Sequence, residues 1–183
     1  MSQIPTQIPT MKGARYIAEA ARAVGIDHVF FVDAVLRRAL VEMEEVGIRR
    51  VLARSEKAAA YRADGYSRAA RRPALCMAQS VGAANLAAGL QDAFLGQSSV
   101  VALTGRKPAM EQYRNAYQEI PHEPLFSAVT KMTARVDLPD QLPLLAELGC
   151  EVEPQPFAAG DVWAYRNRSA LPRARLLASW QPA

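Results

Sequence analysis

The sequence of 183 residues has few of the side chains that build metal centres, disulfide frameworks or hydrolase triads. Its two cysteines, Cys76 and Cys150, lie far apart, without a CxxC pairing or a histidine nearby. The two histidines, His28 and His122, are isolated, with no serine or cysteine constellation around them. A zinc site, a disulfide framework and a Ser-His-Asp type of active site are therefore not expected.

Long apolar runs and concentrated charge are absent as well. No apolar stretch approaches the ~20 residues needed to span a bilayer, and the N-terminus lacks the basic and apolar regions of a signal peptide. The formal net charge of +4, from 22 Lys and Arg against 18 Asp and Glu, is too small an excess for a nucleic-acid-binding surface. Half of the residues are hydrophobic, which suits one domain with a core. We expect a cytoplasmic protein with no membrane or nucleic-acid partner.

From Gly13 onward, short apolar runs alternate with helical patterns. Residues 28–32 form a nearly continuous apolar run, typical of a strand buried on both faces, and similar runs follow at 51–53, 74–78, 99–104 and 129–136. Helical patterns separate the first four of these runs, so the strands should be parallel neighbours joined by right-handed crossovers. The predicted fold class is α/β, a three-layer, doubly wound parallel sheet with helices on both faces.

The two ends of the chain do not follow this alternation. Residues 1–12 include the tandem repeat Q-I-P-T and are predicted to be a disordered tail. The domain is expected over residues 13–148. Beyond it, prolines interrupt the chain and no helical stripe forms, which predicts an irregular segment over residues 149–183 and a domain incomplete at its C-terminus.

Candidate site residues follow the predicted strands, because parallel sheets bind ligands at the carboxyl ends of their strands. Asp33, Glu56, Gly82 and Arg106 all lie in such turns. Gly82 begins a helix whose free amides could face a ligand, yet the turn matches neither GxxxxGK[ST] nor GxGxxG, and the glycine could simply turn the chain. Glu56 could equally be an ordinary carboxylate at a helix start. The residues alone leave both alternatives open.

Six segments resemble, in order and spacing, the N-terminal pyrimidine-binding domain of thiamine diphosphate enzymes of the acetolactate synthase type. Residues 56–68 are similar to the family's E-x-A-A-x-x-x-A-x-G-Y-A-R segment, and residues 79–85 to its S-G-P-G-x-x-N loop. The remaining similarities are D-A-F at 92–94, A-L-T-G at 102–105, A-Y-Q-E at 116–119 and V-T-K at 129–131. The resemblance covers residues 13–145.

The resemblance implies thiamine diphosphate as the cofactor, of which this chain would bind the pyrimidine half only. In the family, the glutamate that matches Glu56 hydrogen-bonds a ring nitrogen of the cofactor's aminopyrimidine and so promotes removal of a proton from the thiazolium carbon, which then attacks a 2-oxo acid. The implied catalytic residues are Glu56 and Gln118, and the implied cofactor-binding residues are Glu56, Ser80, Gly82 and Asn85. The implied activity is that of a 2-oxo acid decarboxylase or carboligase.

The sequence departs from the family in two ways. Val81 replaces the loop proline, and Asp33 is an acidic residue where the family has small ones, so the role of Asp33 and the substrate stay undetermined. The family's diphosphate and Mg²⁺ site, with its G-D-G motif, belongs to a separate domain. The triplet Gly160-Asp161-Val162 is interpreted as a coincidence, and no metal site is expected on this chain.

Two hypotheses follow for the role of the chain. In the first, it is the pyrimidine-binding part of an enzyme that needs a separate diphosphate- and Mg²⁺-binding domain or subunit, within a homo- or hetero-oligomer. In the second, it is a truncated or frameshifted product without catalysis, acting at most as a dimerising or regulatory module. In neither case is the chain expected to be active alone.

Overall fold

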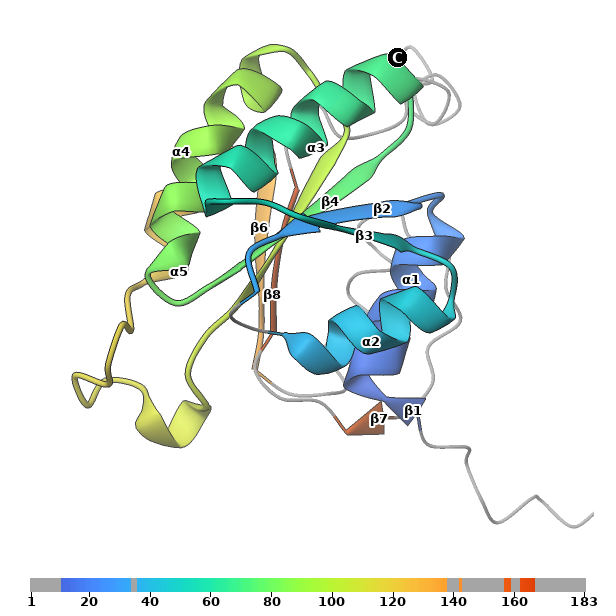
Figure 1. Cartoon of the computed structure of the whole chain (residues 1–183). Coiled ribbons are helices and arrows are strands. Elements are labelled where there is room, and N and C mark those ends of the chain that lie inside the picture. Colours follow the sequence, from blue (N-terminus) through green and yellow to red (C-terminus); the bar gives the residue numbers. More distant parts are fainter. Residues whose placement is uncertain (1–10, 34–35, 138–141, 143–156, 159–161, 167–183) are drawn as a thin grey trace, which may run out of the picture.

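The structure is a computed structural model that describes residues 11–33, 36–137, 142, 157–158 and 162–166. Its two sheets and the surrounding helices are shown in Figure 1. Most of the predicted terminal segments, and the Gly160-Asp161 pair, lie outside the described residues. In chain order the elements are β1 (Met11–Lys12), α1 (Gly13–Ala23), β2 (His28–Phe31), α2 (Arg37–Glu45), β3 (Arg49–Leu52), α3 (Glu56–Ala70), β4 (Ala74–Gln79), α4 (Gly82–Leu95), β5 (Val100–Gly105), η1 (Ala109–Glu111), α5 (His122–Ser127), β6 (Met132–Val136), β7 (Phe157–Ala158) and β8 (Val162–Arg166).

The main sheet confirms the predicted α/β class. Its strand order is β3-β2-β4-β5-β8-β6, and β2, β3, β4 and β5 pair in parallel. The chain moves from β2 to β3 on one side and then returns to place β4 on the other side of β2. The order therefore reverses between β2 and β4, and the carboxyl ends of these two strands form the topological switch point at which such sheets bind ligands.

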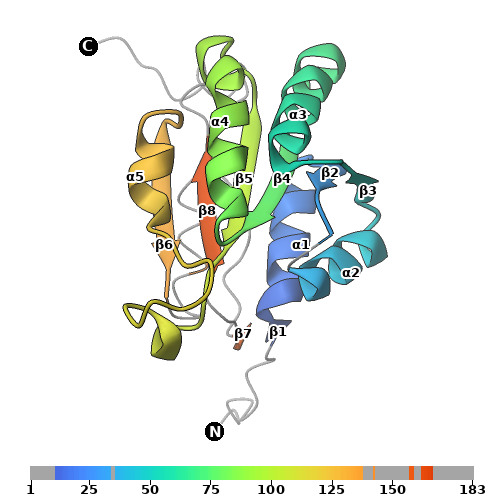
Figure 2. The same cartoon turned by 60° about the vertical axis from the view of Figure 1, so that its left-hand side comes forward.

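Helices cover both faces of the sheet, with α1 and α2 on one side and α3, α4 and α5 on the other (Figures 1 and 2). The strands serve both layers because consecutive side chains point to opposite faces. In β2, Val29 and Phe31 belong to the core cluster of α1 and α2, whereas Phe30 belongs to the cluster of α3 and α4. A strand buried on both faces is thus apolar at every position, which explains the continuous run in the sequence.

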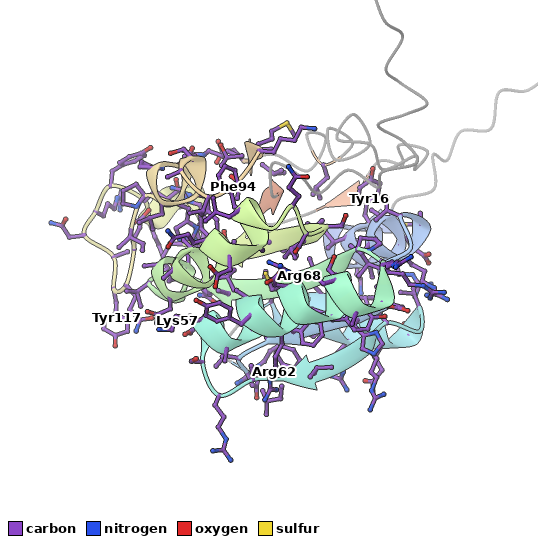
Figure 3. All side chains as sticks on the ribbon, turned by 90° about the horizontal axis from the view of Figure 1, so that it is seen from above. Tyr16, Lys57, Arg62, Arg68, Phe94 and Tyr117 are labelled. Atoms are coloured by element: carbon purple, nitrogen blue, oxygen red, sulfur yellow. The ribbon has the colours of Figure 1, made fainter. Side chains whose placement is uncertain are left out.

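The helices α3 and α4 lie side by side and pack closely (Figure 3). Their contact is made by small side chains, since Ala59, Ala60 and Ala63 of α3 and Ala83 of α4 are completely buried. A Cβ atom on Gly89 of α4 would lie 2.7 Å from the Lys57 carbonyl oxygen, so glycine is required for this approach. Arg68 lies between the two helices and donates from Nη2 to the Asp92 carbonyl oxygen at 3.0 Å.

The C-terminal part of the chain differs from the expectation of an irregular segment at two places. Strand β8 lies between β5 and β6 in the main sheet and runs antiparallel to both. Strand β7 pairs with β1, so Met11 and Lys12, assigned to the tail from the sequence, belong to a two-stranded sheet. The helix α5 was also not predicted, because its six residues are too few to show a helical period. In the described part of the chain, no helix is both long enough and apolar enough to cross a membrane.

A polar cluster around Asp27 lies at the end of the sheet opposite the switch point and stabilises it. The Tyr66 hydroxyl donates to Asp27 Oδ1 at 2.6 Å, Arg72 Nη1 donates to Oδ2 at 3.1 Å, and His28 Nδ1 lies 3.0 Å from Oδ1. Desolvation acts to raise the pKa of Asp27, but these hydrogen bonds outweigh it and lower the pKa to about 2. The cluster joins α3 to the start of β2.

This cluster predicts a pH dependence of stability. The carboxyl of Asp27 has a lower pKa in the folded chain than its ordinary 3.8, so its contribution is present above pH 4 and is lost as the pH falls towards 2. Between pH 5 and pH 3, the free energy of unfolding in urea should fall by about 1 kcal/mol more in the wild type than in Asp27→Asn. Equal losses in the two proteins would contradict this role.

Candidate active site

A cavity of about 380 Å³ opens at the topological switch point. Val32, just after β2, forms one side, and residues of the turn between β4 and α4 form the floor. The start of α3 and the segment between β5 and α5 complete it. Its volume is within the range of small-molecule sites, ~300 to 1,000 Å³. The cavity thus lies at the edge of the sheet where the strand ends considered in the sequence analysis come together.

Glu56 is placed in this cavity by the cap of α3. Ser55 has an extended backbone, and its Oγ accepts a hydrogen bond from the Ala58 amide at 3.2 Å. This N-cap fixes the first turn of the helix and makes Glu56 its first residue. Glu56 is thus the first residue of a helix, as expected of an ordinary helix-start carboxylate, and it also lines the cavity.

The Glu56 carboxylate contacts the turn between β4 and α4 at two predicted site residues. Asn85 Nδ2 donates to Glu56 Oε2 at 3.2 Å. A Cβ atom on Gly82 would lie 2.6 Å from Glu56 Oε1, so the absence of a side chain at Gly82 leaves the space that the carboxylate occupies. Glycine is therefore needed here for the close approach of the Glu56 carboxylate.

Ser80 forms the tight bend between β4 and α4. Its φ of 47° is in the left-handed region, where glycine is favoured, and it matches the glycine position of the S-G-P-G motif. The bend is held because the Ser80 amide donates to the Gly105 carbonyl oxygen at 2.9 Å and its own carbonyl oxygen accepts from the Ala83 amide at 3.0 Å. These bonds join the ends of β4 and β5.

The segment between β5 and α5 provides the remaining wall. Gln118, predicted from the resemblance, lines the cavity together with Tyr117 and Lys107. Gln118 has a φ of 64°, and Tyr113 and Asn115 are also left-handed. Non-glycine residues rarely adopt this conformation, and clusters of them are typical of functional segments. Tyr117 is 79% exposed and points away from the ribbon in Figure 3.

The polar residues behind this wall are structural. His122 begins α5 and is 1% exposed, with Nδ1 3.0 Å from Thr104 Oγ1. Burial lowers the pKa of His122 to about 4, with a hydrogen bond to the Ser80 backbone opposing the shift and the positive charge of Arg106 adding to it. Arg106 forms an ion pair with Glu119 at 3.4 Å, and both side chains are largely buried. These residues hold the Ser80 bend and the Gln118 segment against β5.

Several other candidates lie away from the cavity. Asp33 pairs with the exposed Arg37 at 3.2 Å and borders a second hollow of about 920 Å³ between α2 and β3. His28 is the first residue of β2 and belongs to the Asp27 cluster. Burial raises the pKa of the Cys76 thiol, which is unsuited to be a nucleophile, and Cys150 lies outside the described residues.

Sequence reasoning missed Lys107 and Tyr117 as residues of the cavity. Tyr117 precedes Gln118 in the A-Y-Q-E motif, so the motif itself could have indicated it. Lys107 follows the strand-end turn that includes Arg106, and extending that turn by one residue would have found it. Among the described residues, no group of three or more His, Cys, Asp or Glu side chains is arranged to hold a metal ion.

The arrangement fits a planar heteroaromatic ring with a basic nitrogen. Glu56 offers a carboxylate oxygen that can share a proton with a ring nitrogen, and Asn85 orients this carboxylate. The glycine at position 82 lets the carboxylate lie against the turn, and apolar contacts from Val32 and Met77 suit a ring face. Similar combinations of a few polar groups in a mostly preformed cavity are typical of cofactor sites.

Comparison with known proteins gives one family. Residues 11–125 match the sequence profile of the thiamine pyrophosphate enzyme, N-terminal TPP binding domain. The chain is 35% identical over 143 residues to a probable acetolactate synthase large subunit of Methanocaldococcus jannaschii, covering 73% of this chain and 23% of the relative. It is 35% identical over 152 residues to the acetolactate synthase isozyme 2 large subunit of Escherichia coli, covering 80% and 28%. The chain spans about a quarter of the length of these curated relatives.

Proposed function

Because the chain belongs to the thiamine pyrophosphate enzymes and corresponds to their N-terminal TPP binding domain, we propose that it is the pyrimidine-binding part of a 2-oxo acid decarboxylase or carboligase. The observation that carries the proposal is the contact of the Glu56 carboxylate with Gly82 and Asn85 inside the cavity at the switch point. Glu56, from one motif, lies there against Gly82 and Asn85, which belong to a second motif further along the chain.

In this proposal, Glu56, Ser80, Gly82 and Asn85 hold the aminopyrimidine of thiamine diphosphate. Thiamine diphosphate, when bound, supplies the carbanion-stabilising chemistry of the reaction. Glu56 holds a proton between its carboxylate and the ring nitrogen, and Asn85 Nδ2 keeps the carboxylate in place. Gln118 lines the same cavity and contacts the substrate in this proposal.

The proposal includes a second domain or subunit that binds the diphosphate and Mg²⁺. The described residues that line the cavity include one cation, Lys107, for a group with several negative charges. Diphosphate groups in proteins are usually held through a metal ion with oxygen ligands. The chain alone should therefore bind thiamine diphosphate weakly and should not turn over substrate.

The Glu56→Gln substitution tests the proposal in the assembled enzyme. Mixing the wild-type chain with the diphosphate-binding domain or subunit should give Mg²⁺-dependent cofactor binding by titration calorimetry and conversion of a 2-oxo acid. Glu56→Gln should lower turnover by roughly 100-fold or more, since it removes an acid–base group.

The matched control is Glu45→Gln, the same change at an exposed position of α2 on the other face of the sheet. It should leave turnover unchanged. An inert wild-type mixture, or equal turnover of Glu56→Gln and the wild type, would refute the proposed function.

A further inference from the structure

The cavity holds one positive charge in addition to the Glu56 carboxylate. Among the described residues that line it, Lys107 is the one basic side chain and Glu56 is the one acidic side chain. Glu56 lies against the turn after β4, and Lys107 follows β5, the neighbouring strand. Neighbouring strands are about 4.8 Å apart. The two residues of opposite charge therefore line the same cavity, Glu56 from the start of α3 and Lys107 from the segment after β5.

The backbone of Lys107 is held by a chain of hydrogen bonds from β6. The amide of Gln112, a residue only 5% exposed, donates from Nε2 to the Lys107 carbonyl oxygen at 2.9 Å. Its Oε1 accepts from Arg135 Nη2 at 2.9 Å. The preceding Arg106 takes part in the buried ion pair with Glu119. The two consecutive basic residues thus lie in different places: Arg106 is largely buried in its ion pair, and Lys107 lines the cavity.

The ammonium group of Lys107 keeps most of its capacity to donate hydrogen bonds. The ion pair given for it by the described residues is with Glu111, where Nζ and Oε2 are 3.6 Å apart. This distance is too long for a hydrogen bond. The Glu111 side chain is 53% exposed, and exposed pairs of this kind hold their partners weakly. An anionic ligand in the cavity can compete with Glu111 for Lys107.

We infer that Lys107 binds the carboxylate of the substrate, a small 2-oxo acid, and selects it over neutral carbonyl compounds. The inference rests on the proposed function and assigns one of its missing parts, the residue that recognises the charge of the substrate. A carboxylate accepts charge-assisted hydrogen bonds from an ammonium group, and a neutral amide or ester of the same acid does not attract it in this way. Lys107 is therefore a specificity residue that lines the same cavity as the acid–base residue Glu56.

NMR titration of the ¹⁵N-labelled full chain with pyruvate at low ionic strength tests this role. Pyruvate should shift the Lys107 amide and its neighbours in a saturable way, and its neutral amide, 2-oxopropanamide, should not. Lys107→Gln should weaken the affinity about tenfold, and Lys107→Met should do the same. Glu111→Gln should strengthen it, because it removes the competing carboxylate. Lys131→Gln, an equal charge loss at an exposed lysine, should bind as the wild type does.

A separate titration with thiamine distinguishes this inference from the proposed function. If thiamine shifts the amides of Gly82 and Asn85 while Lys107→Gln leaves pyruvate binding unchanged, the role of Lys107 is wrong and the proposed function stands. If pyruvate binds through Lys107 and thiamine shifts neither amide, the cavity is an anion site and the proposed function fails. If neither ligand shifts these residues, both are wrong.

Discussion

Replacing Gly82 by alanine is expected to lower turnover of the assembled enzyme on the order of 100-fold while leaving the fold nearly as stable as before. The new Cβ atom would lie 2.6 Å from Glu56 Oε1 and 3.1 Å from its Cδ. The atoms that must move belong to the end of a flexible side chain, so the chain can relieve the clash by displacing the carboxylate. This displacement moves the acid–base group away from its place beside the ring nitrogen.

Two measurements separate the effect on the site from an effect on folding. Urea unfolding should give a free energy for Gly82→Ala within about 0.5 kcal/mol of the wild type. The control is Gly65→Ala, a glycine of α3 whose new Cβ would meet no atom within 4 Å. Gly65→Ala should leave turnover unchanged. Wild-type turnover in Gly82→Ala would show that the Glu56 carboxylate does not need this position.

Replacing Gly89 by alanine should have the opposite consequence, a large loss of stability without any direct effect on the cavity. The Cβ atom would lie 2.7 Å from the Lys57 carbonyl oxygen and 2.8 Å from Ala60 Cβ. A backbone atom cannot move without shifting α3 away from α4. Overpacking of this kind typically costs about 1 to 3 kcal/mol, against a gain of about 1 kcal/mol from the better helix propensity of alanine, so the net loss should reach about 2 kcal/mol.

Gly65→Ala is again the matched control, because it makes the same change inside a helix where space is open. It should raise the free energy of unfolding by up to about 1 kcal/mol. Chemical denaturation of both variants measures the contrast directly. If Gly89→Ala were as stable as Gly65→Ala, the close approach of α3 and α4 would not be a tight contact in solution.

The sequence predicts the parts of this fold that depend on local patterns. The apolar run of β2 follows from burial on both faces, and the start of α3 follows from the cap that Ser55 provides. The helix α4 begins at Gly82, after the glycine-containing turn and without a side-chain cap. The orientation of β8 does not follow from any local pattern, since pairing depends on how the chain returns to the sheet. The helix α5 is too short to produce a period.

The candidate site was predicted only in part for a related reason. Glu56, Gly82 and Asn85 lie in motifs that could be recognised, but their mutual contact is a property of the folded sheet. Lys107 belongs to no motif, and its place in the cavity depends on hydrogen bonds from Gln112 on the same segment. Asp33 looked like a site residue because it follows a strand, yet it pairs with Arg37 and lines the second hollow instead.

The central claim is that the Glu56 carboxylate contacts a ring nitrogen of the aminopyrimidine. It is tested most directly by measuring the affinity of the wild-type chain and of Glu56→Ala for two ligands, thiamine and an analogue in which that nitrogen is replaced by carbon. The wild type should bind thiamine about tenfold more tightly than the analogue, and Glu56→Ala should bind the two alike, because the hydrogen bond is then missing on one side or the other. An equal preference for thiamine in both proteins would contradict the claim.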